Sequence, residues 1–378
     1  MRPTWAEVSL SALQRNFRVI EKHVGPDVTV CAVVKADAYG HGAVECARAL
    51  IEAGAAWLGV TSTEEGVRLR EAGIGGRILL MTGFWRGEEE AVIRHKLTPA
   101  VWQRESLDQL QAAAKKMNVG AVPVHVKLDT GMARLGLAQG DEKKFLKALL
   151  ASGRVVAEGV FSHLASAEVL NAKDAADQER RFAQAFARFA KAGVRPRFLH
   201  LANSAAIAAR RSTWHNFVRP GISLYGYQLP YVNSGKHTAV APVLPVVPVL
   251  SWKTRIIGLR DVPKGQPVGY NGAFVTKAKT TLAVLPVGYA DGLSRKLSSA
   301  GRVIVRGKYA PIAGRVSMDI TLADVTGIGD AAVGDEVVIL GCSGECAINA
   351  DEHACLAGTI SYEVLCDIGA RVRRTWVK

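Results

Sequence analysis

Short apolar runs alternate with amphipathic stretches over the first two-thirds of the chain. The runs are rich in β-branched and aromatic residues and are apolar on both faces, which is typical of buried parallel strands covered by helices. Eight such runs are found, and each one is followed by polar or amphipathic sequence. They are Val28–Val34, Trp57–Val60, Ile78–Met81, Thr98–Val101, Val122–Val126, Ala157–Phe161, Phe198–Leu201 and Phe217–Leu224.

The stretches between the runs carry helix signals. Ala43–Ala53 and Asp141–Ala151 are amphipathic and are followed by Gly54 and Gly153, which suit helix C-termini. The stretch Asp177–Ala192 places three phenylalanines on one face, the pattern of a helix packed on a core. Eight strand-then-helix units predict a (β/α)8 barrel of the TIM type, whose active sites lie at the C-terminal ends of the strands.

The pattern changes at about Ala239. Apolar runs become closely spaced, Gly and Asp turns separate them, and no long helical period intervenes, which predicts a mainly-β domain. We therefore expect two domains, residues 1–238 and residues 239–378, with the alternating segment Trp5–Leu10 able to pair with the β domain. The strand candidates are Lys253–Leu259, Thr281–Val287, Arg302–Val305, Ile320–Val325 and Asp335–Leu340.

Composition narrows the functional classes. Hydrophobic residues make up 49% and charged residues 22% of the 378, as in ordinary globular proteins. With neither a secretory leader pattern near Met1 nor an apolar run of membrane-spanning length, we expect a cytoplasmic protein without a membrane partner. The net charge of +14 comes from scattered Lys and Arg without a nucleic-acid reader motif, so we expect no nucleic-acid partner. The six cysteines lack paired metal-ligand spacing, so we expect no metal site.

Lys35 ends the first apolar run. A lysine at the end of a buried strand lies in a low dielectric, which favours the neutral, nucleophilic amine. Such an amine can form a Schiff base with a carbonyl cofactor or substrate. A single lysine after a strand is most often a surface residue, so its meaning depends on segment 33–42 (VVKADAYGHG) and on other segments far along the chain.

Five further segments carry candidate chemistry. Ser204 and Gly221 follow the seventh and eighth runs, whose loops commonly bind phosphate in barrels of this kind. Arg134 follows the fifth run and brings a guanidinium suited to a carboxylate or a phenolate. In the β domain, Tyr270 lies in the turn GYNG, and residues 315–319 (RVSMD) form another compact polar turn. Taken singly, each of these signals has an ordinary structural explanation.

Together these segments resemble the alanine racemases, a family that uses pyridoxal 5′-phosphate. The resemblance is carried by residues 33–42, 127–136, 218–226, 314–319 and 360–363, in order over nearly the whole chain. It implies a (β/α)8 barrel followed by a mainly-β domain, an amino-acid substrate and D-alanine supply for peptidoglycan. The cofactor-binding residues that it implies are Lys35, Tyr39, Arg134, His163, Asn203, Ser204, Arg219, Gly221, Ile222 and Tyr362.

The resemblance also implies roles in catalysis. Lys35 holds the cofactor and acts as the base on one face of the substrate, and Tyr270 acts on the other face, supported by His163. Arg134 and the backbone of Met318 contact the substrate carboxylate. Such an enzyme is a head-to-tail homodimer in which Tyr270 and Met318 enter the partner's barrel.

Two cationic residues have more specific implications. In the family, Arg219 faces the pyridine nitrogen, and because a guanidinium cannot accept a proton the ring stays unprotonated. Lys127 matches a position that is often carbamylated, where the new anion orients Arg134; whether this chain carries the modification stays open.

Three other functions stay open from the residues alone. One is a racemase of broad specificity that acts on serine, lysine or arginine, because no motif identifies the side chains that set substrate size. A second is a barrel decarboxylase of basic amino acids, although such enzymes pair the pyridine nitrogen with an acid rather than with a residue such as Arg219. A third is a non-catalytic carrier of pyridoxal phosphate, which would not need the domain that contains Tyr270.

Overall fold

Eight parallel strands form a nearly closed barrel in the larger of two units, which comprises residues 13–38 and 43–246. The computed structural model describes residues 2–170, 172–233, 236–240 and 244–378. The strand order is β8-β7-β6-β5-β4-β3-β2-β9. The strands are β2 (Thr29–Val33), β3 (Trp57–Val60), β4 (Arg77–Leu80), β5 (Leu97–Val101), β6 (Val122–Lys127), β7 (Val155–Phe161), β8 (Phe198–His200) and β9 (Phe217–Val218).

The seam of the barrel lies between β8 and β9, the two end strands of the sheet. Asn216 bridges this seam with its side-chain amide: Oδ1 accepts from the amide of Leu199 at 2.8 Å, and Nδ2 donates to the carbonyl of Arg197 at 2.7 Å. The amide of Arg219 also donates to the carbonyl of Ala202 at 3.1 Å. These bonds satisfy backbone groups that an open sheet edge would leave unpaired.

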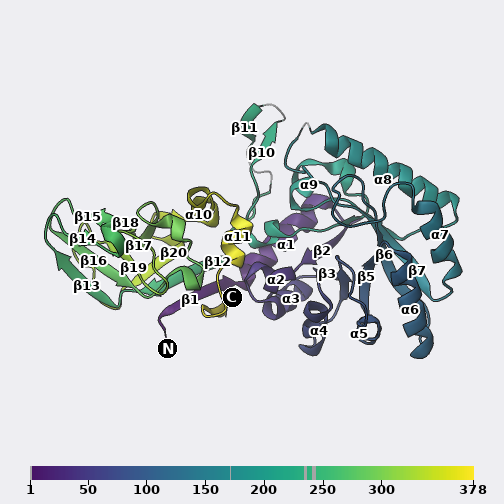
Figure 1. Cartoon of the computed structure of the whole chain (residues 1–378), viewed down its shortest axis with the longest axis horizontal. Coiled ribbons are helices and arrows are strands. Elements are labelled where there is room, and N and C mark those ends of the chain that lie inside the picture. The colour runs from purple at the N-terminus through teal and green to yellow at the C-terminus, as the bar shows by residue number, and fades with distance from the viewer. Residues whose placement is uncertain (1, 171, 234–235, 241–243) are drawn as a thin grey trace. The chain divides into compact units, whose positions relative to one another are not determined.

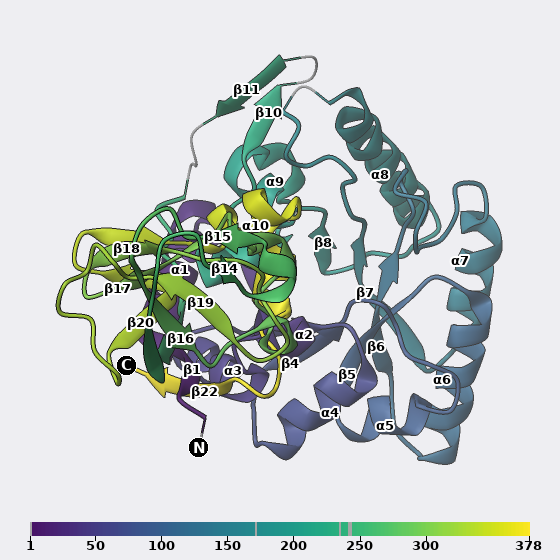
Figure 2. The same ribbon diagram turned by 60° about the vertical axis from the view of Figure 1, so that its left-hand side comes forward.

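Helices cover the outside of the barrel strands, as Figures 1 and 2 show for α4 to α8. The start of α4 illustrates how the sequence sets a boundary: Ser62 accepts from the amide of Glu65, and the Glu65 carboxylate accepts from the amide of Ser62, a capping box. The helices of this unit are α1 (Leu10–Val24), α3 (Ala43–Glu52), α4 (Thr63–Glu71), α5 (Glu89–Arg94), α6 (Arg104–Lys116), α7 (Glu142–Ala151), α8 (Lys173–Lys191) and α9 (Ser204–Ala209).

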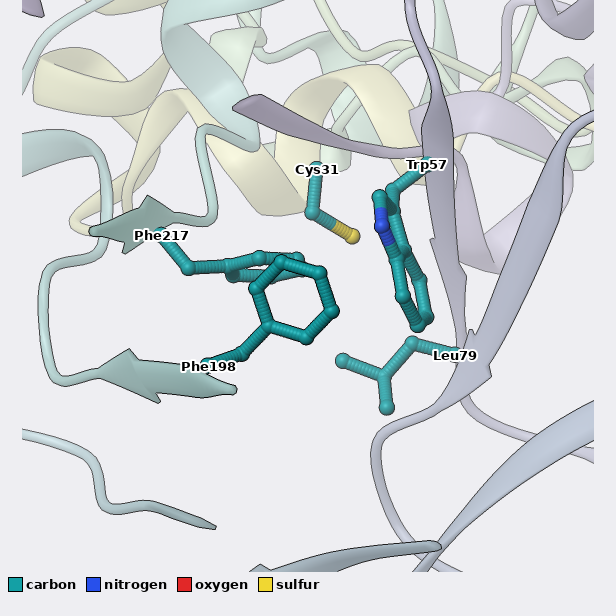
Figure 3. Packing of buried hydrophobic residues seen from close by; sticks show 5 residues of the cluster. All are labelled: Cys31, Trp57, Leu79, Phe198 and Phe217. Carbon is teal, nitrogen blue, oxygen red and sulfur yellow. The ribbon is translucent and has the colours of Figure 1, made fainter. Parts of the chain in front are cut away.

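An aromatic cluster fills the barrel interior. Cys31, Trp57, Leu79, Phe198 and Phe217 come from five different strands, and their side chains point toward one another (Figure 3). The rings of Phe198 and Phe217 meet that of Trp57 edge-on, with centroids 5.4 Å apart in both pairs. Edge-to-face packing of this kind adds to the stabilisation from burial, so the barrel is a packed core rather than a pore.

The smaller unit comprises residues 1–12, 39–42 and 247–378 and consists mainly of antiparallel strands. Its largest sheet has the order β18-β17-β20-β12-β1-β22, in which β1 pairs antiparallel with β12 and parallel with β22. The strands are β1 (Thr4–Ser9), β12 (Leu250–Arg255), β13 (Gly258–Val262), β14 (Pro267–Val268), β15 (Phe274–Val275), β16 (Thr280–Leu285), β17 (Arg302–Val305), β18 (Lys308–Pro311), β19 (Thr321–Asp324), β20 (Glu336–Ser343), β21 (Cys346–Ile348) and β22 (Arg373–Val377), with short helices α10 (Ala350–Ala357) and α11 (Ser361–Cys366).

The predicted fold class is confirmed, but two predicted strands are wrong in extent. The run Phe217–Leu224 is a strand only over β9, because Pro220 has no N–H to donate and residues 222–225 form a 3₁₀ turn. The run Lys253–Leu259 divides between β12 and β13, which belong to different sheets. The division that we predicted after residue 238 falls within the hairpin of β10 (Tyr231–Asn233) and β11 (Lys236–Val240).

Among the helices that the structure describes, none combines the length and the apolar character that a membrane span requires.

Candidate active site

Lys35 follows β2 and begins a backbone turn of unusual hand, α2 (Lys35–Tyr39). Its side chain is half-buried. The four residues from Ala36 to Tyr39 have φ between 51° and 56°, the left-handed region, which costs L-residues about 1–2 kcal/mol each. The amide of Ala36 donates to the carboxylate of Glu65 at 2.6 Å, the same carboxylate that caps α4. The fold therefore stabilises a strained backbone beside the lysine that we predicted to be reactive.

Lys127 is the last residue of β6 and lies among cations. It is 6% exposed. Burial above all, together with the charges of Arg219, Arg134 and Lys35, lowers the pKa of its amine to about 8, against a smaller opposing effect of Asp129. This places the barrel residues that we singled out in one electrostatic neighbourhood, at the C-terminal ends of the strands.

Arg219 follows β9 and is almost completely buried, at 4% exposure. Its Nη1 donates to Nδ1 of His200 at 2.7 Å, and its Nη2 donates to the carbonyl of Ser162 at 2.8 Å and lies 3.4 Å from Nδ1 of His163. Its Cζ lies 5.2 Å from the centre of the Phe161 ring. Burial lowers the pKa of Arg219 to about 10, so the guanidinium stays charged at neutral pH.

His163 follows β7 and is neutral at physiological pH. Its pKa lies well below the ordinary value because the ring is buried and because Arg219, Lys127, Arg134 and Lys35 are nearby cations. A neutral imidazole can both accept and donate a hydrogen bond. The contact of Nδ1 with Arg219 therefore uses the accepting nitrogen and leaves Nε2 to carry the proton.

The loops after β8 and β9 meet through Ser204. Its Oγ accepts from the amide of Gly221 at 2.9 Å and from the amide of Ser223 at 3.4 Å. Ile222 lies between them and begins the 3₁₀ turn of residues 222–225. Asn203 is the N-cap of α9, where its Oδ1 accepts from the amide of Ala206 at 3.0 Å. Backbone amides and a small hydroxyl thus gather at the barrel end where phosphate binds in many such barrels.

Tyr39 and Tyr362 belong to the smaller unit and lie next to each other. Their ring centroids are 6.0 Å apart, and Tyr39 is buried. Burial raises the pKa of the Tyr39 phenol, and the proximity of Tyr362 adds to this effect, so the phenol stays protonated. Gly40 packs so closely that a Cβ would lie 2.5 Å from the carbonyl oxygen of Leu365 in α11. This close approach ties the segment after Tyr39 to the helix that carries Tyr362.

Tyr270 and Met318 are also residues of the smaller unit, and both are exposed, at 69% and 52%. Tyr270 lies in a turn whose other residues have positive φ: Gly269, Asn271 and Gly272. The carbonyl of Met318 accepts from the amide of Ala290 at 3.1 Å. Both side chains are therefore left largely uncovered by their own unit.

Two buried histidines of the barrel were missed by reasoning from the sequence. His200 accepts from Arg219, and His125 bonds to His200 with 2.8 Å between the two ring nitrogens. The available signal was a histidine inside an otherwise apolar run, as in the Val-Pro-Val-His-Val sequence of β6. A buried polar residue in such a run needs a hydrogen-bond partner, and a second inward-facing histidine was its natural candidate.

The fold and these residues first define a class: a (β/α)8 barrel with a lysine and buried cations at the C-terminal strand ends, joined to a mainly-β unit. The model of the alanine racemase N-terminal domain matches residues 8–229, and that of the alanine racemase C-terminal domain matches residues 249–376. The chain therefore belongs to the alanine racemase family, as its sequence motifs predicted.

Individual relatives agree with this membership. An alanine racemase of Halothermothrix orenii is 41% identical over 99% of this chain and 97% of its own. The crystal structure of the alanine racemase from D-cycloserine-producing Streptomyces lavendulae is 35% identical, with a TM-score of 0.92 over 100% of this chain and 98% of its own. That of the Bartonella henselae alanine racemase with covalently bound pyridoxal phosphate is 30% identical, with a TM-score of 0.86 over the whole of both chains.

Proposed function

We propose that this protein interconverts L-alanine and D-alanine with pyridoxal 5′-phosphate bound covalently to Lys35. The observation that carries the proposal is the position of this lysine after the first barrel strand, near the buried cations Lys127 and Arg219. The loop after the neighbouring eighth strand lies beside it, since the amide of Val33 donates to the carbonyl of Pro220 at 3.0 Å. An amine and a phosphate-binding loop are groups that this cofactor requires, and a cation without a proton-accepting site suits the racemase use of it.

The residues fit the cofactor. Ser204 and the amides of Gly221 and Ile222 would bind its phosphate, with Asn203 shaping the start of α9 and with Tyr39 and Tyr362 as further donors. Arg134 would contact its phenolic oxygen. Arg219 would face the pyridine nitrogen, and His163 lies 3.4 Å from Arg219.

Racemisation needs a proton removed from one face of Cα and another returned on the opposite face. When bound, the cofactor supplies an electron sink that makes this proton acidic. Lys35 Nζ would take or give the proton on one face and the Tyr270 hydroxyl on the other, each as a general acid or base. Arg134 and the backbone of Met318 would hold the substrate carboxylate, which keeps Cα between the two groups.

Lys127 and Arg219 would set the charge near Arg134 and the protonation of the pyridine nitrogen. The pKa of about 8 leaves a fraction of the Lys127 amine neutral at physiological pH, and a neutral amine can react with carbon dioxide. Carbamylation would turn a cation among cations into an anion that orients Arg134. Arg219 cannot accept a proton, so it would keep the pyridine nitrogen unprotonated and disfavour side reactions such as decarboxylation.

A homodimer would complete the site. Tyr270 and Met318 are exposed on their own unit, and exposed apolar and aromatic side chains on a rigid turn are typical of an interface. We propose a head-to-tail dimer in the cytoplasm, in which these residues serve the partner's barrel, with D-alanine used for peptidoglycan.

The decisive experiment is an assay on the purified, cofactor-loaded protein with a panel of L-amino acids. Alanine should give D-enantiomer fastest. Faster racemisation of serine, lysine or arginine would assign a broad-specificity racemase, release of carbon dioxide would assign a decarboxylase, and bound cofactor without turnover would assign a carrier. Any of these three results would replace the proposal.

The shared site has its own test. Inactive Lys35→Ala and Tyr270→Ala proteins are mixed under conditions that allow subunits to exchange. If each site uses Lys35 of one subunit and Tyr270 of the other, a heterodimer contains one intact site and recovers up to about half of the activity of the wild-type dimer. Absence of recovery despite exchange would show that each subunit works alone.

A further inference from the structure

A chain of buried polar side chains runs through the barrel from Arg219 toward the N-terminal ends of the strands. Arg219 Nη1 lies 2.7 Å from His200 Nδ1, and His200 Nε2 lies 2.8 Å from His125 Nδ1. Both imidazole rings are completely buried. Beyond them, His125 Nε2 faces Oε2 of Glu158 at 3.9 Å, and both terminal nitrogens of Arg77 bind that carboxylate.

The chemistry of arginine fixes the proton positions along this chain. A guanidinium has donors and no acceptor, so His200 Nδ1 must accept from Arg219 and the His200 proton must be on Nε2. Because this Nε2–H then donates to His125 Nδ1, the proton of His125 must be on its own Nε2. One donor-only group therefore determines the tautomer of two histidines.

Glu158, at the far end of this chain of side chains, requires the same direction of hydrogen-bond donation. A carboxylate is an acceptor, so Glu158 favours an N–H over a lone pair at His125 Nε2. At 3.9 Å this is an electrostatic contact rather than a hydrogen bond. With the opposite tautomers, lone pairs would face the carboxylate at one end while N–H groups faced Arg219 at the other. A donor-only group and an acceptor-only group thus agree from opposite ends of the barrel.

Packing and burial keep both rings in place and neutral. The ring of Phe161 stacks on that of His200 with centroids 4.6 Å apart and planes 1° apart, and Phe198 stacks on His125 at 5.9 Å. Burial and nearby cations lower the pKa of His200 well below its ordinary value and that of His125 to about 3. The two histidines between Arg219 and Glu158 therefore carry no charge.

We infer that His125 is a positioning residue for Arg219, because it accepts the Nε2 proton of His200 and so holds the imidazole that anchors the guanidinium. Without an acceptor at this place, a buried N–H would lose its partner and the ring would be free to turn away. Arg219 would then keep the carbonyl of Ser162 but lose a fixed direction for Nη1. The expected effect on turnover rests on the proposed function, in which Arg219 faces the cofactor. The direction of hydrogen-bond donation from Arg219 through His200 to His125 does not rest on it.

The test compares three variants of the cofactor-loaded protein. His125→Leu removes the acceptor, and we expect kcat to fall about tenfold with KM within about twofold, the scale of one lost hydrogen bond. His125→Asn places Oδ1 near the position of Nδ1, so kcat should return to within about threefold of wild type. Phe198→Leu is the matched control, because it disturbs the packing around His125 and removes no hydrogen bond. A fall in Phe198→Leu as large as in His125→Leu, or no rescue by asparagine, would overturn the inference.

A second measurement does not depend on activity or on a variant that folds. In wild-type protein labelled with ¹⁵N-histidine, NMR should show His125 and His200 with protonated Nε2 and unprotonated Nδ1 from pH 6 to pH 9. A proton on either Nδ1, or a doubly protonated ring, would contradict the assigned direction. Failure of the racemase assay in the wild-type protein would refute the proposed function instead, and the tautomers would still decide the inference.

Discussion

Two candidate residues of the barrel, Arg219 and Lys127, and two of the smaller unit, Tyr270 and Met318, are held in opposite ways. Arg219 is buried and bonded to a histidine and a backbone carbonyl, and Lys127 is buried among other cations. Tyr270 and Met318 are exposed and stand on turns. Arg219 and Lys127 are therefore already enclosed by their neighbours, whereas Tyr270 and Met318 are side chains that their own unit leaves uncovered.

This difference indicates which properties a substitution on each side should change. A barrel residue is constrained by several partners, so a change there disturbs the binding of cofactor and the local charge. Tyr270 has little of its own unit to disturb, so a change there should affect the reaction and leave the fold intact. Substitutions on the two sides can therefore be separated by what they leave unchanged.

Lys35→Ala should have the largest effect. Without the amine, the cofactor loses its covalent attachment and the substrate loses one of its two bases, so racemase activity should fall by about 10³-fold or more. The visible absorbance of the purified protein should be lost on desalting. Retention of tightly bound, coloured cofactor by the variant would show that another residue is the anchor.

Tyr270→Phe should reduce kcat by about 10²–10⁴-fold, because it removes one general acid or base. The visible spectrum and the melting temperature should match wild type, since the change removes one hydroxyl from a side chain that packs little against its own unit. In deuterated water, the Cα proton of one alanine enantiomer should still exchange, because Lys35 remains. Exchange that is lost for both enantiomers equally would contradict a division of the two faces between these residues.

The barrel strands could be predicted well because they are apolar on both faces, as in β3, where prediction and structure coincide at Trp57–Val60. Segment 33–42 was recognised as one motif, yet the structure assigns residues up to Ala38 to the barrel unit and residues from Tyr39 to Gly42 to the smaller one. That division depends on Gly40 approaching Leu365, a contact across more than 300 residues that no local pattern contains.

The site shows the same limit. The candidate residues were found through motifs, which identify chemistry next to strand ends. The partnership of His125 and His200 was not found, because it depends on which side chains face inward from β6 and β8 and on how far apart the two strands lie. Alternation along one strand does not determine either quantity.

Lys127, a barrel residue, should make the free energy of unfolding depend on pH. Its pKa of about 8 lies below the ordinary lysine value of 10.5, so between these values the unfolded chain binds a proton that the native protein lacks. The free energy of unfolding should therefore rise with pH in this window, by on the order of 1–3 kcal/mol, and lose this gain as pH falls through 8. Denaturant unfolding of wild type and Lys127→Met in bicarbonate-free buffer measures it, because the variant lacks this contribution.

Carbamylation would change that result in a recognisable way. With bicarbonate present, intact-protein mass spectrometry under non-denaturing conditions should detect one added carbon dioxide in wild type and none in Lys127→Met. The rise in stability with pH should shrink as the modification forms. An identical pH profile in wild type and variant without bicarbonate would show that Lys127 is not desolvated as described.

Gly40→Ala should act on folding rather than on chemistry, and it tests how the smaller unit holds Tyr39. Gly40 has φ +80°, and its Cβ would meet the Leu365 carbonyl, so we expect a loss of about 3 kcal/mol or more in the free energy of unfolding. Gly73→Ala, in the barrel unit, is the matched control: φ is +74° and nothing lies within 4 Å, so only the backbone cost of about 1–2 kcal/mol remains. Because the two variants share the change and the sign of φ, the difference between them isolates the close approach to α11. Equal losses would show that backbone conformation alone requires the glycine, and that the contact with Leu365 does not hold this segment.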